Sequence, residues 1–301
     1  MVLLTGASGF IGKHLLTALI KEYGKDHILA LTSTPIKEAH YLLHNGYNFE
    51  ADYFIKSGCG SQIHTIIHAG AYTPKSSKQA NDVVKCNSNI ISADKLLSAD
   101  LPNLRKIIYL STLDVYGPAE IILESSLVQP GSLYGESKLY VEKMITAWGN
   151  ANSNVHQILR VGHVYGPGEQ AYQKIIPVTI KKLLQDQPLQ IWGTGKEIRS
   201  FIYVKDVVDA IMHALKLDQS AGIINLVSSQ KITIAVLVNK LIALSGKNIV
   251  PEVVPVDTPG KDLIFNNRKM KDLLFLNETT LDDGLLQEWT YMKNLQHENN
   301  L

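Results

Sequence analysis

The sequence predicts an α/β protein with a doubly wound parallel sheet and a smaller C-terminal α/β domain. Short apolar runs alternate with segments that carry apolar residues at helical spacing through the first half of the chain. A glycine-rich turn, GASGFIG, directly follows the first of these runs. After Tyr165-Gly166-Pro167-Gly168 the alternation weakens and turn-forming residues become frequent. Together these observations favour a parallel sheet first and a second, smaller domain after it.

The predicted strands are five apolar runs, and most are separated by helical patterns. Leu15, Leu16, Leu19 and Ile20, for example, have the spacing of one helix face. Alternating strands and helices form βαβ units, whose ligands bind beyond the carboxyl ends of the strands. The runs cover residues 2–4, 28–31, 63–67, 107–110 and 155–160.

The chain divides into two predicted domains. Because a glycine-rich turn follows the first run, as in dinucleotide-binding sheets, residues 1–166 are predicted to form a dinucleotide-binding domain. We expect residues 198–225 to return to it because they contain a helical stretch suited to packing on the first sheet. The remaining residues, 167–197 and 226–301, form the substrate-binding domain. The chain is therefore predicted to cross the domain boundary more than once.

The charge balance and cysteine count exclude several classes of protein. The 301 residues include 29 Lys and Arg against 28 Asp and Glu, so no net field attracts nucleic acid or an anionic membrane. No segment reaches the ~18 uninterrupted apolar residues of a membrane span, and the apolar N-terminus lacks the basic start of a signal peptide. Cys59 and Cys86 are too few for a disulfide framework. We therefore expect a soluble, unprocessed cytoplasmic protein.

The turn GASGFIG, residues 6–12, has the features of a phosphate-binding turn. It lies between a strand and a helix, where glycines allow a tight turn and free N–H groups at the helix start face an anion. The alternative is a purely structural glycine turn. The position of the motif directly after the first strand favours phosphate binding, and with it a Rossmann-type sheet.

The residues after the second predicted strand bear on the choice of cofactor. A dinucleotide fold usually carries an acidic residue here to hold the adenosine 2′-hydroxyl. This chain has Thr32, Ser33 and Thr34 instead, and Lys37 lies nearby. Hydroxyl groups tolerate a 2′-phosphate that an aspartate would repel, which favours NADP over NAD unless the run is an ordinary polar loop.

Tyr134 and Lys138 are four residues apart, so a helix would place a phenol and an ammonium on one face. A neighbouring cation stabilises a phenolate and would bring the tyrosine pKa of about 10 toward neutral pH. Thr112 lies just past the strand-like run 107–110, where its hydroxyl could bind a substrate oxygen that also faces Tyr134. This set of side chains suits acid–base catalysis.

At these motifs the chain resembles the extended short-chain dehydrogenase/reductase family that acts on nucleotide sugars. The matching segments lie in the family's order between residue 1 and about residue 225. They are GASGFIG at 6–12, STLDVYG at 111–117, YGESK at 134–138, residues 159–168 and RSFIYVKDVV at 199–208.

The resemblance implies roles for individual residues. Thr112, Tyr134 and Lys138 match the catalytic trio, and Arg199 matches an arginine that binds the substrate diphosphate. With the two turns described above, the predicted cofactor-binding residues are Gly6, Ser8, Gly9, Phe10, Ile11, Gly12, Thr32, Ser33, Thr34, His68, Ala69, Gly70, Asn89, Tyr134 and Lys138. The predicted substrate-binding residues are Tyr72, Thr73, Thr112, His163 and Arg199.

Two departures from the family's pattern are informative. His163 stands where many members carry asparagine, which changes the contacts to the sugar phosphates. The family's dehydratases follow the catalytic threonine with aspartate and glutamate, whereas this chain has Leu113 and Asp114. Loss of the first carboxylate argues against dehydration.

The leading hypothesis is an NADP-dependent reductase of a 4-keto-6-deoxy nucleotide sugar. The alternative is an NAD-dependent nucleotide-sugar 4-epimerase, such as a UDP-glucose 4-epimerase, which needs the same catalytic trio. A non-catalytic NADP-binding regulator is disfavoured because Tyr134 and Lys138 are both present.

Several further expectations accompany these hypotheses. The resemblance suggests a homodimer through the helices after Asn89 and over 134–147. We predict no metal site, since His64 and His68 lie in an apolar run and favour packing. Trp192 and Trp289 could stack on a nucleotide base, but a core or interface role is favoured.

Overall fold

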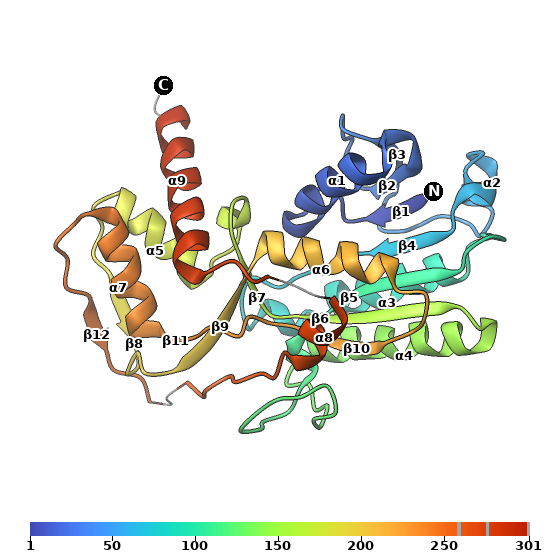
Figure 1. Cartoon of the computed structure of the whole chain (residues 1–301). Helices are drawn as coiled ribbons and strands as arrows, with labels where there is room; N and C mark the ends of the chain where they lie inside the picture. Colours follow the sequence, from blue (N-terminus) through green and yellow to red (C-terminus); the bar gives the residue numbers. More distant parts are fainter. Residues whose placement is uncertain (258–259, 275–276, 300–301) are drawn as a thin grey trace.

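The computed structural model describes residues 1–257, 260–274 and 277–299. A seven-stranded parallel sheet forms its centre, in the order β10-β6-β5-β4-β1-β2-β3, which confirms the predicted fold class (Figure 1). The strands of this sheet are β1 (Val2–Thr5), β2 (Ile28–Thr32), β3 (His40–Leu43), β4 (Thr65–His68), β5 (Lys106–Thr112), β6 (Val155–Val161) and β10 (Gly222–Leu226).

Helices cover both faces of this sheet. On one face lie α1 (Phe10–Tyr23) and α6 (Val204–Lys216), which contact each other, and on the other lie α3 (Val83–Leu97) and α4 (Leu133–Asn152) (Figure 1). Leu4 packs with the first pair of helices and its neighbour Leu3 with the second. Because successive strand residues point to opposite faces, a strand covered on both sides is apolar throughout.

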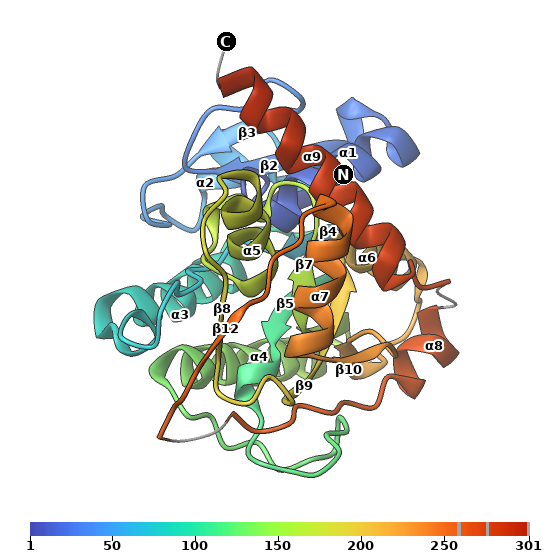
Figure 2. The same cartoon turned by 90° about the vertical axis from the view of Figure 1, so that its left-hand side faces the viewer.

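A second lobe carries two small sheets. In one, β9 (Ile198–Tyr203) lies between β7 (His163–Tyr165) and β11 (Lys231–Thr233), and in the other β8 (Gln190–Trp192) pairs with β12 (Glu252–Val254). Three mutually contacting helices pack here, and Figure 2 shows them at the front. They are α5 (Ile175–Leu184), α7 (Ile234–Ser245) and α9 (Leu281–Asn299).

The chain crosses between the lobes more than once. After β9 it returns to the large sheet as α6 and β10, and α8 (Arg268–Leu274) packs against both of these elements. The short elements are η1 (Lys25–His27), α2 (Tyr53–Lys56), η2 (Gly60–Gln62), η3 (Gln79–Asn81), η4 (Leu113–Val115) and η5 (Glu169–Ala171). None of the helices that the structure describes is long and apolar enough to cross a membrane.

The strand order reverses between β1 and β4, and this places a crevice at their carboxyl ends. Thr5 ends β1 opposite His68, which ends β4. Gly6 then turns the chain with φ +72°, and a Cβ on it would lie 2.6 Å from the Cα of Gly70. Only glycine allows the two loops to approach this closely.

The edge strand β3 was absent from the sequence prediction. The residues of β3 are HYLL, and its apolar run of three residues is mostly exposed at the edge of the sheet, where no motif beside it marks a strand. β3 nevertheless lies beside the predicted cofactor loop, since Leu43 pairs with Thr32.

Candidate active site

A cavity of about 630 Å³ extends along the carboxyl ends of the strands of the large sheet. It lies where a doubly wound sheet binds its ligand. Most of the predicted site residues line it. They are Gly6, Ser8, Gly9, Phe10, Ile11, Gly12, Thr32, Ser33, Ala69, Gly70, Tyr72, Thr73, Asn89, Thr112, Tyr134, Lys138 and His163.

The backbone of the glycine turn forms part of the wall of this cavity. Gly9 caps the N-terminus of α1, and a Cβ on Gly12 would overlap the carbonyl oxygen of Gly6. The turn and the first turn of α1 are therefore tightly joined, and the free N–H groups of the helix start lie beside the cavity. This cradle suits a pyrophosphate.

The hydroxyl groups of Tyr134 and Thr112 meet at one end of the cavity. The Tyr134 hydroxyl interacts with the hydroxyls of Thr112 and Thr73. Ser132 caps α4 by accepting a hydrogen bond from the Gly135 N–H at 3.2 Å, and a Cβ on Gly135 would lie only 2.5 Å from the carbonyl oxygen of Asp114. Gly135 thus lets the start of α4 approach η4, which brings the tyrosine to the threonine.

Lys138 lies one helical turn beyond Tyr134 and is fully buried. Its Nζ donates a hydrogen bond to the carbonyl oxygen of Leu110 at 2.6 Å and lies 4.2 Å from the centre of the Tyr109 ring. Burial lowers the pKa of Lys138 to about 7, against the opposing charge of Glu142.

The pKa of Tyr134 differs from the sequence-based expectation. Burial, followed by the charge of Asp114, raises the pKa of the Tyr134 phenol, whereas the spacing to Lys138 predicts a decrease. The reason is that the cavity wall removes water from the phenol, which disfavours its charged form. The phenol therefore keeps its proton at neutral pH.

A buried ion pair supports the strands behind these residues. Arg160 on β6 donates to Glu142 on α4 from Nε at 2.9 Å and from Nη2 at 2.6 Å. The hydroxyl of Ser111 donates to Oε1 of the same carboxylate at 2.5 Å. Because Ser111 precedes Thr112 and Glu142 follows Lys138 by one turn, this network joins both sides of the site.

Asn89 positions the loop after β4. Its Oδ1 accepts from the Tyr72 N–H at 2.8 Å, and its Nδ2 donates to Ser137 Oγ at 3.2 Å. Asn89 therefore holds Tyr72 and Thr73 against α4, close to Tyr134.

Two predicted cofactor residues lie off the cavity wall. His68 is buried beneath it, bonded to Thr5 Oγ1 at 2.8 Å and stacked on Tyr109, and burial lowers its pKa to about 3. Thr34 is also absent from the wall, and its N–H donates to the side chain of Thr32. Among the described residues, no group of three or more His, Cys, Asp or Glu side chains is placed to hold a metal ion.

Arg199 lines a second pocket, of about 390 Å³, in the other lobe. Its Nη1 donates to the carbonyl oxygens of Ile198 and Lys261 at 2.8 and 2.7 Å, which orients the guanidinium. Trp192 lies on the same wall with 64% of its surface exposed, so it has no core role, and the interface role favoured beside it stays a prediction.

Lys174 lines both cavities and is not among the predicted site residues. It lies one residue before α5, where no motif marks it. Burial lowers the pKa of the nearby His163 to about 4, and the charges of Arg199 and Lys174 add to this effect. A neutral imidazole and two cations thus lie where the two cavities approach each other.

These features agree with a family comparison. The model of the NAD dependent epimerase/dehydratase family matches residues 2–226, which include the glycine turn, Thr112, Tyr134 and Lys138. The chain belongs to this family. The match covers the large sheet and ends with β10.

Relatives in this family have different activities. A dTDP-D-glucose 4,6-dehydratase from Dictyostelium discoideum is 27% identical over 81% of this chain, which spans 62% of that protein. A dTDP-4-dehydro-6-deoxyglucose reductase from Escherichia coli is 28% identical over 94% of this chain and 95% of its own length. The crystal structure of UDP-glucuronic acid 4-epimerase from Bacillus cereus in complex with NAD has a TM-score of 0.83 and 26% identity, and covers 98% of this chain and 99% of that one.

Proposed function

We propose that this epimerase/dehydratase family member is an NADPH-dependent reductase of a 4-keto nucleotide sugar. The observation that carries the proposal is the buried phenol of Tyr134 beside the hydroxyl of Thr112, at one end of a dinucleotide-sized cavity, where burial raises the pKa of the phenol. A ketone reduction needs a proton donor at this position, and a phenol with a raised pKa holds its proton until it is needed.

The residues of the cavity fit a dinucleotide with a 2′-phosphate. The glycine turn cradles the pyrophosphate, and Thr32 and Ser33 lie at the far end from Tyr134, where the adenosine ribose belongs. Asp114 is the one acidic residue among the described residues that line the cavity, and it lies beside Thr112 rather than at the adenosine end. On the part of the cavity wall that the structure describes, no carboxylate at the adenosine end repels a 2′-phosphate.

The chain's own groups complete the reduction. When bound, the nicotinamide cofactor supplies a hydride to the carbonyl carbon of the sugar. Thr112 donates a hydrogen bond to the carbonyl oxygen, and Tyr134 transfers its phenolic proton to that oxygen as the alcohol forms. Lys138, which the resemblance pairs with the ribose hydroxyls, stabilises the resulting phenolate.

The second pocket suits the nucleoside diphosphate part of the substrate. Arg199 and Lys174 offer positive charge to phosphate oxygens, and the exposed Trp192 offers a flat face to a base. The sugar then lies between the pockets, near His163 and Tyr134. This arrangement directs the sugar C4 oxygen toward Thr112.

A 4-epimerase is the second candidate, because the likeness to the NAD-bound UDP-glucuronic acid 4-epimerase extends over nearly the whole chain. It would use the same Thr112, Tyr134 and Lys138. A dehydratase is disfavoured although such enzymes are among the relatives, since Leu113 occupies the place of the acid that assists water elimination.

The experiment that tests the proposal measures cofactor use. The purified protein is incubated with NADPH and a 4-keto-6-deoxy nucleotide sugar, and NADPH loss is compared with alcohol formed. The reductase consumes one NADPH per product. An epimerase instead purifies with bound NAD and interconverts glucose- and galactose-configured sugar nucleotides without net cofactor loss, and that result would replace the proposal.

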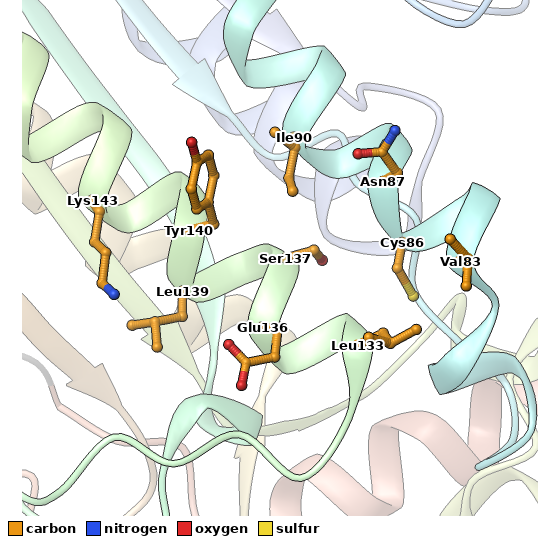
Figure 3. A pocket seen from close by; sticks show the side chains of 10 residues that line it. All are labelled: Val83, Cys86, Asn87, Ile90, Leu133, Glu136, Ser137, Leu139, Tyr140 and Lys143. Atoms are coloured by element: carbon orange, nitrogen blue, oxygen red, sulfur yellow. The ribbon is translucent and has the colours of Figure 1, made fainter.

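We also propose that the chain forms a homodimer through α3 and α4. A pocket of about 290 Å³ lies between these helices. Figure 3 shows apolar side chains from both helices around it, together with polar ones such as Glu136 and Lys143. Val83 and Tyr140 on its wall are 69% and 54% exposed, and contact between two copies of the chain would bury them. Tyr140→Asp should shift the mass measured by light scattering from twice 33.3 kDa to 33.3 kDa, while Val250→Asp, elsewhere on the surface, should not.

A further inference from the structure

A loop that holds Tyr47 in an unusual backbone conformation lines the adenosine end of the cavity. The turn 45–48, in which the Asn48 N–H donates to the carbonyl oxygen of Asn45 at 2.9 Å, has positive φ at Gly46 and at Tyr47, both +60°. A tyrosine rarely adopts this conformation, because its Cβ is strained at positive φ. Such strain persists where surrounding contacts enforce it, and often at ligand sites.

The contacts of the Tyr47 ring explain how the turn is held. Its hydroxyl interacts with Thr5, and a Cβ on Gly70 would lie 2.6 Å from that hydroxyl. Since β2 lies between β3 and β1, the tyrosine reaches from the loop after β3 over the end of β2 to the end of β1. Its ring therefore forms part of the floor of the adenosine half of the cavity.

His44 lies against this ring and presents one nitrogen that is not used by the protein. The two ring centres are 4.1 Å apart, and Nδ1 of His44 accepts the N–H of Tyr47 at 3.2 Å. An accepting Nδ1 leaves the ring proton of the neutral imidazole on Nε2. Within the residues that the structure describes, Nε2 makes no hydrogen bond, and His44 lines the cavity with Thr32 and Ser33.

The position of His44 relative to the ribose follows from the sheet. The His44 N–H donates to the carbonyl oxygen of Thr32 at 3.0 Å, so the histidine lies beside the last residue of β2. In a dinucleotide fold, the residue at the end of this second strand meets the adenosine 2′ position. Thr32 and Ser33 carry no charge, and an imidazole N–H beside them is a donor suited to a phosphate oxygen.

We propose that His44 is the specificity-determining residue for the adenosine 2′ position, and that its Nε2–H donates to the 2′-phosphate of NADP. The inference rests on the NADPH part of the proposed function. In this chain, the residue that recognises the 2′ position then comes from the loop after β3 rather than from the loop after β2. Tyr47 then acts as the platform that holds the imidazole in place.

Two substitutions separate this role from a structural one. Asparagine at position 44 places a polar group near Nδ1 of the histidine and keeps an acceptor for the Tyr47 N–H, but does not reach Nε2. Glutamine reaches the position of Nε2 with an N–H donor and loses the acceptor near the backbone. His44→Asn and His44→Gln therefore divide the two functions of the imidazole, and His40→Asn, on the exposed part of β3, is the matched control.

The experiment measures Kd for NADPH and for NADH by calorimetry on the full chain without sugar substrate. A lost hydrogen bond to a charged group predicts that His44→Asn weakens NADPH binding by ~10- to 100-fold and NADH binding by less than about 3-fold. His44→Gln should keep NADPH within about 3-fold, and His40→Asn should match the unsubstituted chain.

Other outcomes overturn the inference. If His44→Gln weakens both cofactors equally while His44→Asn weakens neither, the histidine only supports the turn at Tyr47. If both variants keep the ratio of the Kd values for NADPH and NADH, His44 does not recognise the 2′ position, although the NADPH reductase proposal stands. If the unsubstituted chain binds NADH more tightly than NADPH, the cofactor part of the proposed function fails, and this inference fails with it.

Discussion

The carboxyl groups of Glu169 and Glu288 lie together in the interior, where each residue is only 1% exposed. Glu169 belongs to η5 and Glu288 to α9, so the pair joins the loop beside the cofactor cavity to the last helix. Lys174 Nζ lies 3.4 Å from Glu169 Oε2 and supplies one compensating charge. Two buried carboxylates and one ammonium leave one negative charge in excess unless the pair keeps a proton.

This pair predicts a loss of stability as the pH rises. Burial raises the pKa of both groups, and for Glu288 the charge of Glu169 adds to the effect of burial. Both are carboxyls whose folded-state pKa lies above the unfolded value near 4.5, so the folded state binds more protons. The contribution of this pair to the free energy of unfolding is therefore complete below about pH 4.5. It is lost as the pH rises through the raised pKa values of the two carboxyl groups.

Glu288→Gln should remove most of this dependence, because an amide needs no proton to stay neutral. We expect the variant to be more stable than the unsubstituted chain at pH 9 by about 1–3 kcal/mol, and to differ little at pH 5. Urea unfolding at the two pH values measures this, with Glu298→Gln on the exposed side of α9 as the control. Equal slopes of stability against pH for all three proteins would contradict the shared proton.

Tyr134→Phe tests the proton donor. The substitution removes one hydroxyl from a buried ring and leaves its packing intact, so turnover should fall by ~10²-fold or more while cofactor Kd changes less than about 3-fold. Steady-state kinetics and calorimetry on the same preparation give both numbers. Tyr140→Phe, on the exposed face of the same helix, should keep full activity. Activity of Tyr134→Phe within a few-fold of the unsubstituted chain would remove the tyrosine from the mechanism.

Glu142→Gln tests the ion pair behind the site. It leaves the guanidinium of Arg160 buried and without its carboxylate, which costs about 3–5 kcal/mol of folding free energy. The double variant Glu142→Met with Arg160→Met should recover most of this loss, since apolar groups of similar volume need no partner. If the single variant unfolds at the same urea concentration as the unsubstituted chain, the pair contributes little.

The edge strands β3 and β10 are not among the predicted runs, whereas the five inner strands of the large sheet could be predicted because they are buried on both faces. Such strands are continuous apolar runs, and the glycine turn marks where the first one ends. β3 could not be found in this way, because its short apolar run is mostly exposed at the edge of the sheet and no motif marks it as a strand. His44 and Tyr47 were missed with it, since only the pairing of β3 with β2 places them at the cavity.

The site was predictable where a motif carries the chemistry, and less so where packing decides. Gly6, Thr112 and Tyr134 lie on the cavity wall as the motifs suggest. His68 ends β4, yet its side chain faces Thr5 beneath the cavity, an orientation that sequence spacing does not determine. Lys174 reaches both cavities because of how η5 and α5 are joined, and no local pattern indicates this.

Arg199→Lys tests the second pocket as the diphosphate site. Nη1 is occupied by two carbonyl oxygens, and Nη2 lies beside the backbone of Gly260 on the pocket wall. Lysine cannot both hold the loop and bind two phosphate oxygens, so KM for the nucleotide sugar should rise by ~10-fold. Arg105→Lys, at an exposed position elsewhere, is the control. A lower Tm with an unchanged KM would assign Arg199 a structural role.

Ser33→Asp tests the cofactor choice from the loop after β2. Ser33 lines the adenosine end of the cavity, so a carboxylate there would lie near the 2′ position. Two unit charges at 4 Å interact with about 1 kcal/mol in water and about 4 kcal/mol near a protein surface. Because a 2′-phosphate carries nearly two charges, the ratio of the Kd values for NADPH and NADH should shift toward NADH by ~10-fold or more.

The neutral variant Ser33→Asn identifies the cause of that shift. It has nearly the shape of aspartate without the charge, so it should keep the NADPH preference if repulsion is responsible. Equal shifts for the two variants would mean that the size of the side chain, rather than its charge, excludes the phosphate. An unchanged ratio of the two Kd values for Ser33→Asp would place the adenosine ribose away from the end of β2. The hypothesis of an epimerase with bound NAD would then gain support.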